Sequence, residues 1–364
     1  MVRRGSGIEI VAAACAAIVV LASLAVATAR SRPRTAATAT AAPSAPATAA
    51  PTAPPRPTPA VTARDFKGVI GAVMTTRTVT VRTKPTDTSP STSTVRAGIL
   101  LPVLVRSGTF VQVMTPCERT GFIPVASSDL VAQATHAAKT IDESTIVVDP
   151  GHGGSESGAT GPHGLKESVV NFDIAERLAG RLSGARVFLT RSGDYMAGLA
   201  FRTAIANSLH ADAFISVHNN ADPDGPSSKP GTETYYQIAS AGSKRLAGLT
   251  YEELLPALER FKAQWVSMKD AGAKYRTSVN GLDYYGVLRR SRIPAVITES
   301  LFISNAPEEA LLAQPTTRQV IADALGRAID RYITTSDPGS GFVTPLLRNE
   351  GTPFVLPPTC QDPT

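Results

Sequence analysis

Two histidines and two glutamates in this chain end predicted strands, follow one directly or begin a predicted helix. His152 lies in VVDPGHGG, residues 147–154, where glycines surround it directly after a run of β-branched residues. Glycine lets the main chain turn sharply and approach a ligand closely. His218 ends AFISVH, Glu299 ends PAVITE, and Glu167 follows the glycine-rich loop. Two histidines and one carboxylate are a common ligand set for catalytic zinc, and a second carboxylate can take a proton from water.

Each of these residues also has an ordinary structural explanation. His152 alone fits an incidental residue of a glycine-rich turn, and His218 fits a capped histidine at a strand end. Glu167 alone fits a solvated carboxylate that the helix dipole favours. Glu299 is harder to explain in this way, because a carboxylate that ends a buried strand needs a partner. Together the four residues are more specific for a metal site than any one of them.

The other three histidines are weaker candidates. His163, in GPHGL, lies in a predicted loop, where it is either a competing metal ligand or a flexible surface residue; we favour the surface residue. His136 and His210 are interpreted as structural or exposed residues.

The elements that must position the four residues follow from the pattern over 140–335. Short apolar runs alternate there with longer helical stretches, which predicts an α/β domain with a mostly parallel twisted sheet flanked by helices. The predicted strands are 145–149, 185–190, 213–218, 232–238 and 294–299. Ligands bind beyond the carboxyl ends of the strands in open parallel sheets, so we expect the four residues to meet on one rim.

Three helices are expected around this sheet. The first begins near Glu167, with an apolar face that consists of Val170, Ile174, Leu178 and Leu182. The second should cover 197–209. The third is expected near 256–271, with an apolar stripe that consists of Leu254, Leu258, Phe261, Trp265 and Met268. We interpret the stripe as a packing face and Trp265 as a core residue, while the segment 242–280 is either a regulatory cover of the site or an ordinary helix.

Residues 65–132 have a different pattern and predict a small all-β barrel. Short runs, TVTVR, ILLPVLV, TFVQVM and RTGFIPVASSDL, are separated by Thr, Ser, Pro and Gly clusters. The segment resembles bacterial SH3-like domains, which often accompany cell-wall enzymes. Phe110 and Phe122 are the main candidates for the aromatic residues of its peptide-binding groove. A role as a spacer or packing domain stays open.

The α/β segment strongly resembles the zinc-dependent N-acetylmuramoyl-L-alanine amidases of bacterial cell-wall metabolism. The family's motifs appear in the family's order: VVDPGHGG, GLKESVVNFDIAERL, VFLTRSGDYM, FRTAIANSLHADAFISVHNNAD, GTETYY, YYGVLRRSRIPAVITESLFISN and NAPEEALL. The resemblance implies that His152, Glu167 and His218 hold Zn²⁺. It also implies that Glu299 is the catalytic carboxylate. The implied substrate is peptidoglycan, in which a zinc-activated water cleaves the amide between N-acetylmuramic acid and the L-alanine of the stem peptide.

Three places depart from the family's pattern. Glu156 stands where the family usually has Asp, and Asn219 where a small residue is usual. Ser300 and Leu301 follow the implied catalytic glutamate, where the family usually has Gly. These changes alter the expected pocket wall, and with it the rate and substrate preference more than the metal.

Two other functions stay open. The first is a zinc peptidase or amidase that cuts a different bond, for example within the stem peptide. The second is a non-catalytic cell-wall-binding or activator protein that keeps the fold without useful turnover, against which the four intact reactive residues argue.

The amino-terminal segment predicts export to the periplasm or cell wall. Residues 1–30 fit either a cleaved signal peptide or, through 8–28, an uncleaved membrane anchor. Residues 31–64 are almost purely Ala, Thr, Pro and Arg, which predicts a disordered linker. Residues 1–64 hold seven Arg and one Glu, so 29 of the 36 basic and 29 of the 30 acidic residues follow them. The folded part is therefore neutral and has no charge that would attract nucleic acid.

A disulfide is expected to connect the predicted barrel to the carboxy-terminal tail, residues 336–364. Cys15 lies within the apolar run, in a setting that lacks the features of a lipidation site. Cys117 and Cys360 are expected to form a disulfide in an oxidising compartment, and two free thiols are the alternative.

Overall fold

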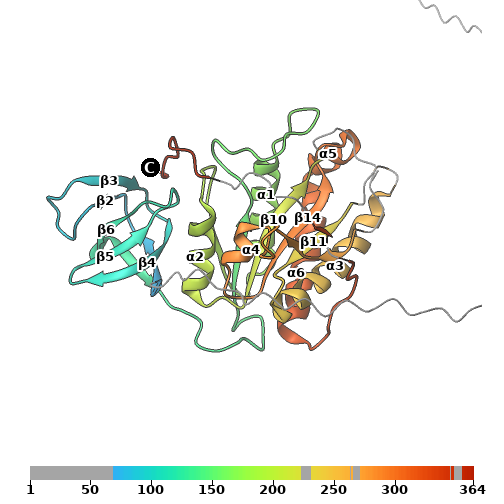
Figure 1. Cartoon of the computed structure of the whole chain (residues 1–364), viewed down its shortest axis with the longest axis horizontal. Coiled ribbons are helices and arrows are strands. Elements are labelled where there is room, and N and C mark those ends of the chain that lie inside the picture. Colours follow the sequence, from blue (N-terminus) through green and yellow to red (C-terminus); the bar gives the residue numbers. More distant parts are fainter. Residues whose placement is uncertain (1–68, 223–230, 263, 265–270, 345, 348–354) are drawn as a thin grey trace, which may run out of the picture. The chain divides into compact units, whose positions relative to one another are not determined.

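The computed structural model describes residues 69–222, 231–262, 264, 271–344, 346–347 and 355–364 (Figure 1). The predictions for residues 1–64 and for Trp265 and Met268 lie outside the described residues. Of the helices that are described, none combines the length and the apolar character needed to cross a membrane.

Six of the described strands form the sheet of the α/β part, in the order β12-β11-β14-β10-β8-β9. They are β8 (Thr145–Pro150), β9 (Arg186–Leu189), β10 (Ala213–Asn220), β11 (Glu233–Tyr236), β12 (Ala273–Lys274) and β14 (Ala295–Phe302). The sheet is mixed, because β11 pairs antiparallel with β14 while the other neighbouring strands are parallel. Residues 221–232 connect β10 to β11.

Helices cover both faces of this sheet, because its strands carry apolar side chains on both sides. The helices are α1 (Glu167–Arg181), α2 (Leu199–Leu209), α3 (Ala241–Leu258), α4 (Gly286–Arg290), α5 (Ala306–Leu312) and α6 (Pro315–Thr334). One apolar core joins α1, α3 and α6 to the face that includes Val148 (Figure 1). Its sequence neighbour Val147 points to the opposite face, where α2 and α4 pack.

Residues 71–131 form an antiparallel sheet of seven described strands, in the order β3-β2-β6-β5-β4-β1-β7. They are β1 (Gly71–Thr75), β2 (Val79–Arg82), β3 (Ser91–Val95), β4 (Leu100–Ser107), β5 (Phe110–Met114), β6 (Thr120–Pro124) and β7 (Ser128–Val131), with the 3-10 turn η1 (Val125–Ser127) before β7. The sequence does not predict β3, because STSTV carries only one large apolar side chain. Phe110 is buried in this sheet's core rather than lining an open groove.

The core of the antiparallel sheet is continuous with one core of the α/β part. Helix α2 contacts β1 and β4. Phe201 and Ile205 of α2 share an apolar cluster with Val73 and Leu101. The helix therefore has two partners, the α/β sheet and the antiparallel sheet.

The helix expected near 256–271 lies elsewhere. Helix α3 begins at Ala241, where Ser240 accepts a hydrogen bond from the Ser243 N–H, and ends at Leu258, two residues after Pro256. A 3-10 turn, η2 (Glu259–Phe261), follows it. Because α3 packs against α6 and β11, this part of the segment 242–280 is an ordinary helix of the domain.

The tail after α6 returns along the molecule to the antiparallel sheet. Phe342 forms a bridge with Ala273 of β12, and β15 (Leu346–Leu347) pairs with β13 (Arg276–Thr277). Cys360 is bonded to Cys117, so the predicted disulfide is confirmed.

Candidate functional site

The four predicted residues come together at the carboxyl ends of β8, β10 and β14. His152 follows β8 by two residues, and Glu167 is the first residue of α1. His218 and Glu299 lie opposite each other in the parallel pair β10 and β14. Residues that are far apart in the sequence therefore share one rim of the sheet.

Glu167 lies between the two histidines. Its Oε2 is 3.1 Å from Nε2 of His152, and its Oε1 is 3.0 Å from Nδ1 of His218. One donor atom from each of the three residues lies within 4.8 Å of the others. The rings of His152 and His218 meet edge to face, with centroids 4.8 Å apart. Two imidazole nitrogens and a carboxylate oxygen at these separations can bind one cation.

Glycines make room for this cluster, which is why they surround His152. A Cβ on Gly151 would lie 2.2 Å from the His218 ring, and a Cβ on Gly158 would lie 2.5 Å from Glu167 Oε2. His152 itself has φ of 61°, a left-handed conformation that is uncommon outside glycine. The loop therefore has no room for a side chain at Gly151 or Gly158, and it holds His152 in an uncommon backbone conformation.

The electrostatics of the cluster favour positive charge. Burial alone would lower the pKa of His152, but the hydrogen bonds and charges of Glu156 and Glu167 outweigh it and raise this pKa to about 10. Burial would raise the pKa of Glu167, but the two histidines hold it well below its usual range. The surroundings that stabilise a proton on His152 also stabilise a metal cation. A divalent cation that prefers nitrogen and oxygen ligands therefore fits these residues.

Buried amides hold the Glu167 carboxylate in place. Glu167 Oε2 accepts a hydrogen bond from the Ala159 N–H at 2.9 Å, and Oε1 accepts one from the Asn219 N–H at 3.2 Å. Asn171 donates to Oε1 at 3.2 Å and accepts from the Asn219 side chain at 2.9 Å. Asn219, expected to alter the pocket wall, thus holds Glu167 in place through its main chain and through Asn171.

Two arginines fix the loop that carries His152. Arg202 of α2 donates to the carbonyl oxygens of Pro150 and His152 and to the buried carboxylate of Asp149. Arg191 donates to the carbonyl oxygens of Pro150 and Gly151. Both guanidinium groups are buried, so they define the loop's path from beneath.

Glu299 is a buried carboxylate beside the cluster. Burial, together with the charges of Glu167 and Glu233, raises its pKa well above the usual range. Its Oε2 is buried without a hydrogen-bond partner among the described residues. A buried oxygen of this kind is free to bind a reacting group.

A second charged group lies on the other side of Glu299. Glu233 is directly opposite Glu299 in the antiparallel pair β11 and β14. It forms an ion pair with Lys274 at 2.8 Å and accepts a hydrogen bond from Asn220 at 3.1 Å. Arg276 is 3.7 Å from Glu233 and donates to the Tyr285 hydroxyl at 2.8 Å. These cations balance part of the negative charge that three neighbouring carboxylates bring to the site.

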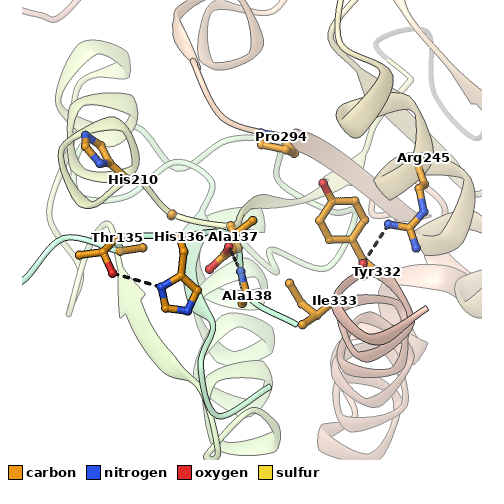
Figure 2. Close-up of a pocket in the computed structure, with 12 residues that line it drawn as sticks. Thr135, His136, Ala137, Ala138, His210, Arg245, Pro294, Tyr332 and Ile333 are labelled. Atoms are coloured by element: carbon orange, nitrogen blue, oxygen red, sulfur yellow. Dashed lines mark hydrogen bonds between the residues drawn. The ribbon is translucent and has the colours of Figure 1, made fainter. Parts of the chain in front are cut away.

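The other histidines do not join the cluster. His163 binds Glu309 of α5, whose carboxylate lies 2.7 Å from its Nδ1, and the His163 side chain is 74% exposed. His136 and His210 are exposed and line a separate cavity of about 460 Å³, which Tyr332 and Arg245 also line (Figure 2). Their interpretation as surface or structural residues is confirmed.

Sequence reasoning did not identify two residues as partners of the cluster. Glu156 follows His152 by four residues, and its carboxylate lies 2.6 Å from His152 Nδ1. Asn171 follows Glu167 by four residues on α1, one helical turn along. The spacing of Asn171 was a usable signal, whereas the contact of Glu156 depends on how the glycine loop turns.

Comparisons with known proteins match the α/β part of the chain. The family described as N-acetylmuramoyl-L-alanine amidase matches residues 146–331. The uncharacterized protein YqiI of Bacillus subtilis (strain 168) is 34% identical over 206 residues, which are 56% of this chain and 91% of that protein. The N-acetylmuramoyl-L-alanine amidase LytC of the same organism is 39% identical over 185 residues, 50% of this chain and 34% of LytC.

A solved structure gives a similar comparison. The catalytic domain of CwlV, an N-acetylmuramoyl-L-alanine amidase from Bacillus (Paenibacillus) polymyxa var. colistinus, is 30% identical with a TM-score of 0.46, covering 53% of this chain and 99% of that one. The family match spans half of the chain and includes all four residues of the rim. This chain is a member of the N-acetylmuramoyl-L-alanine amidase family.

Proposed function

We propose that this protein hydrolyses the amide bond between N-acetylmuramic acid and the L-alanine of the peptidoglycan stem peptide. Family membership supports an amidase that acts on peptidoglycan. The observation that carries the proposal is the cluster of two imidazoles and one carboxylate beside the buried carboxylate of Glu299. Hydrolysis of an amide by a metal-activated water uses this combination of a cation site and a proton carrier.

The proposed metal is Zn²⁺, held by His152, Glu167 and His218. Two histidines and one glutamate leave a coordination position for water, as in other catalytic zinc sites. When bound, zinc supplies Lewis-acid chemistry, which lowers the pKa of a water molecule and polarises a carbonyl group. Asn171 and the main-chain amides of Ala159 and Asn219 keep the Glu167 oxygens directed at the cluster.

Glu299 is the proposed proton carrier. Its unpartnered Oε2 accepts a proton from the attacking water and returns it to the leaving nitrogen of L-alanine. Burial and the neighbouring carboxylates raise its pKa above the usual range of a glutamate, and a group that both accepts and returns a proton works best with a pKa near the working pH. Its strand, β14, lies between β10 and β11, so the backbone that carries Glu299 is held on both sides.

Digestion of purified peptidoglycan by the zinc-loaded protein tests the proposal. The expected products are intact stem peptides that begin with a free L-alanine amine, together with glycan that carries free lactyl carboxylates, both identified by mass spectrometry. Fragments of the stem peptide would indicate a peptidase that cuts a different bond. Binding to the wall without product, even after zinc is added, would indicate a non-catalytic protein.

The rest of the chain fits an exported enzyme. We propose that residues 1–30 direct export or anchor the chain, that 31–64 form a linker, and that 65–132 are an SH3-like domain before the catalytic domain, 140–335. A relative named as a probable cell wall amidase, LytH of Staphylococcus saprophyticus, is 28% identical over 261 residues and supports a location at the wall. Protease added to intact cells checks the location: we expect it to cut the antiparallel sheet if the protein lies outside the membrane.

A further inference from the structure

The loop after His152 returns on itself and brings Glu156 back to the histidine ring. Gly153 and Glu156 exchange main-chain hydrogen bonds of 2.8 and 3.2 Å. Gly153 and Gly154 have φ of 133° and 61°, and a Cβ on either residue would collide with the backbone of Tyr195 or Met196. The loop is therefore held in a tight turn by its own hydrogen bonds and by the segment it packs against.

This turn places the His152 ring between two carboxylates that face different nitrogens. Both oxygens of Glu156 lie 2.6 Å from Nδ1, whereas Oε2 of Glu167 lies 3.1 Å from Nε2. A neutral imidazole carries one proton, and a carboxylate beside one nitrogen favours the proton there. Glu167 is itself a proposed metal ligand, so with a metal bound Glu156 is the carboxylate left to accept a hydrogen bond from the ring. It would then favour the tautomer in which Nδ1 is protonated and Nε2 has a free lone pair.

The second histidine of the cluster has a different arrangement. Its Nδ1 lies 3.0 Å from Glu167, which is itself a member of the cluster. Among the described residues, Glu156 contacts His152 with a carboxylate that is not one of the three candidate metal ligands. The Glu156 side chain is one-third exposed, so it can be changed without removing a core side chain.

We propose that Glu156 is a positioning residue that fixes the orientation and tautomer of His152, so that Nε2 faces the metal. The inference rests on the proposed zinc ligands and deepens them. A carboxylate that accepts a hydrogen bond from a metal-bound histidine fixes the ring and makes its other nitrogen a stronger donor. Removal of such a partner typically weakens metal binding about 10- to 100-fold.

Metal affinity measured on a set of variants tests this role. We would prepare the full chain with Glu156→Gln, Glu156→Asp and Glu156→Ala, and with Glu176→Gln as a matched loss of one exposed carboxylate on α1. Zinc dissociation constants would be obtained by competition with a chelator. We expect Glu156→Ala to weaken zinc binding about 100-fold, Gln and Asp about 10-fold, and the Glu176 control by less than twofold. The Gln side chain keeps an acceptor without the charge, and the Asp side chain keeps the charge on a shorter arm.

A second readout reports the tautomer directly. The chain has five histidines, so ¹⁵N-labelled imidazoles can be assigned through His→Ala variants. In the zinc-loaded wild type we expect Nδ1 of His152 to carry the proton and Nε2 to show the shift of a metal-bound nitrogen. Glu156→Ala should lose this single pattern, and a merely structural residue would leave it unchanged.

Two results would overturn the inference. One is a zinc dissociation constant for Glu156→Ala within twofold of the wild type, and the other is an unchanged His152 tautomer in that variant. Thermal unfolding of each zinc-free variant shows whether it folds, and the Gln and Asp variants keep the test decisive if Glu156→Ala does not. His152→Ala separates this failure from that of the proposed function: if zinc also survives His152→Ala, the ligand set is wrong, whereas its loss there and not in Glu156→Ala rejects only the role of Glu156.

Discussion

Glu167 and Glu299 are two buried carboxylates whose surroundings give them opposite tendencies. Histidines on both sides lower the pKa of Glu167, while burial and neighbouring carboxylates raise that of Glu299. Glu167 is therefore suited to bind a cation in its ionised form, and Glu299 is suited to carry a proton. Two carboxylates with separated pKa values are the usual arrangement for two different chemical roles.

The variants Glu167→Gln and Glu299→Gln should therefore differ in kind. Glu299→Gln keeps the size of the side chain but cannot accept a proton, so we expect it to retain zinc and lose turnover by about 10²–10⁴-fold. Glu167→Gln should bind zinc weakly, because a neutral amide is a poor zinc ligand. Metal content and initial rate, measured at one fixed free-zinc concentration, check both. Loss of zinc from Glu299→Gln with retention in Glu167→Gln would mean that the roles are exchanged.

The two histidines give a prediction of metal stoichiometry. We expect the wild type to bind about one Zn²⁺, and His152→Ala or His218→Ala to lose both the metal and the activity, because two protein ligands hold the ion too weakly against water. His163→Ala is the matched control, since His163 also contacts a glutamate but lies outside the cluster. Elemental analysis after dialysis measures the outcome, and stoichiometric zinc in both single variants would contradict it.

The sequence predicts the four residues of the rim, because each one lies at or just after the end of a predicted strand or at the start of a predicted helix. The carboxyl ends of parallel strands meet at one edge, so the topology converts His218 and Glu299 into neighbours. The contacts that hold the cluster in place are harder to predict from the sequence. Glu156 reaches His152 only because Gly153 and Gly154 adopt left-handed conformations, and a string of residue types does not fix these angles.

The loop from β8 to α1 is an element whose shape depends on glycine. Gly158 has φ of 67°, and a Cβ there would lie 2.5 Å from Glu167 Oε2 and 2.6 Å from the His152 ring. The next left-handed glycine along the loop, Gly164, has φ of 91° and nothing within 4 Å of its Cβ position. A side chain would therefore be strained by the backbone at both positions, but only at Gly158 would it also collide with neighbouring atoms.

This pair gives a controlled prediction. Gly158→Ala should weaken zinc binding by about 10-fold or more, because the methyl group displaces a ligand carboxylate. Gly164→Ala should cost about 1 kcal/mol of stability from backbone strain and leave zinc affinity unchanged. Chelator competition and urea unfolding of the two variants separate the effects. Equal zinc affinities in both would show that the loop moves away from the added methyl group.

Asp283 connects the segment before α4 to the end of β11 and predicts a pH dependence of stability. Its carboxylate accepts a hydrogen bond from the Ile238 N–H at 2.9 Å, and burial raises its pKa from 3.8 to about 6. Since the folded-state pKa lies above the unfolded value, the carboxyl group stabilises the fold in its protonated form. That contribution is present below about pH 4 and is lost as the pH rises through 6.

Asp283→Asn should remove this loss, because the amide keeps the acceptor for Ile238 and has no charge to bury. We expect the variant to gain stability over the wild type between pH 4 and 6, reaching on the order of 1–3 kcal/mol at pH 7.5. Urea unfolding across this range measures the difference. A difference that does not change with pH would assign Asp283 an ordinary pKa.

The elements that sequence patterns describe well are those with a clear hydrophobic pattern. The stripe from Val170 to Leu182 predicts α1, and short, nearly continuous apolar runs predict β8, β10 and β14. The misplaced helix is instructive, because α3 is buried on several sides and its apolar residues continue past Leu258 into a 3-10 turn. Hydrophobic spacing alone extended the helix beyond Pro256, whereas the cap at Ser240 marked its true start.

The molecule as a whole is connected by contacts that no local pattern reveals. Helix α2 shares apolar surface with β1 and β4, and Cys117, Cys360 and Met196 form a further apolar cluster. Asp362 accepts hydrogen bonds from the Cys117 N–H at 2.8 Å and from Arg119 at 2.9 Å. Glu118, which follows Cys117 in the same turn, accepts a hydrogen bond from the Ala200 N–H in the first turn of α2.

Loss of the disulfide should weaken this connection. Replacing Cys117 and Cys360 together by Ser should lower the free energy of unfolding by about 2–5 kcal/mol, since the bond restricts the unfolded chain. Urea unfolding of the exported protein and of the double variant measures the change. Two free thiols, titrated in the denatured but unreduced wild type, would contradict the presence of the bond in the exported protein.

The bond between Cys117 and Cys360 spans 243 positions, and the whole catalytic segment lies inside that interval. In a chain exported amino-terminus first, Cys117 reaches the oxidising side long before its partner does. Any chain that is cut or terminated between them leaves Cys117 as an unpaired thiol, open to capture by another molecule. Under the proposed export, the disulfide can form only after residue 360 has been translocated. It would therefore be absent from a fragment that ends earlier, even from one that contains all four residues of the rim.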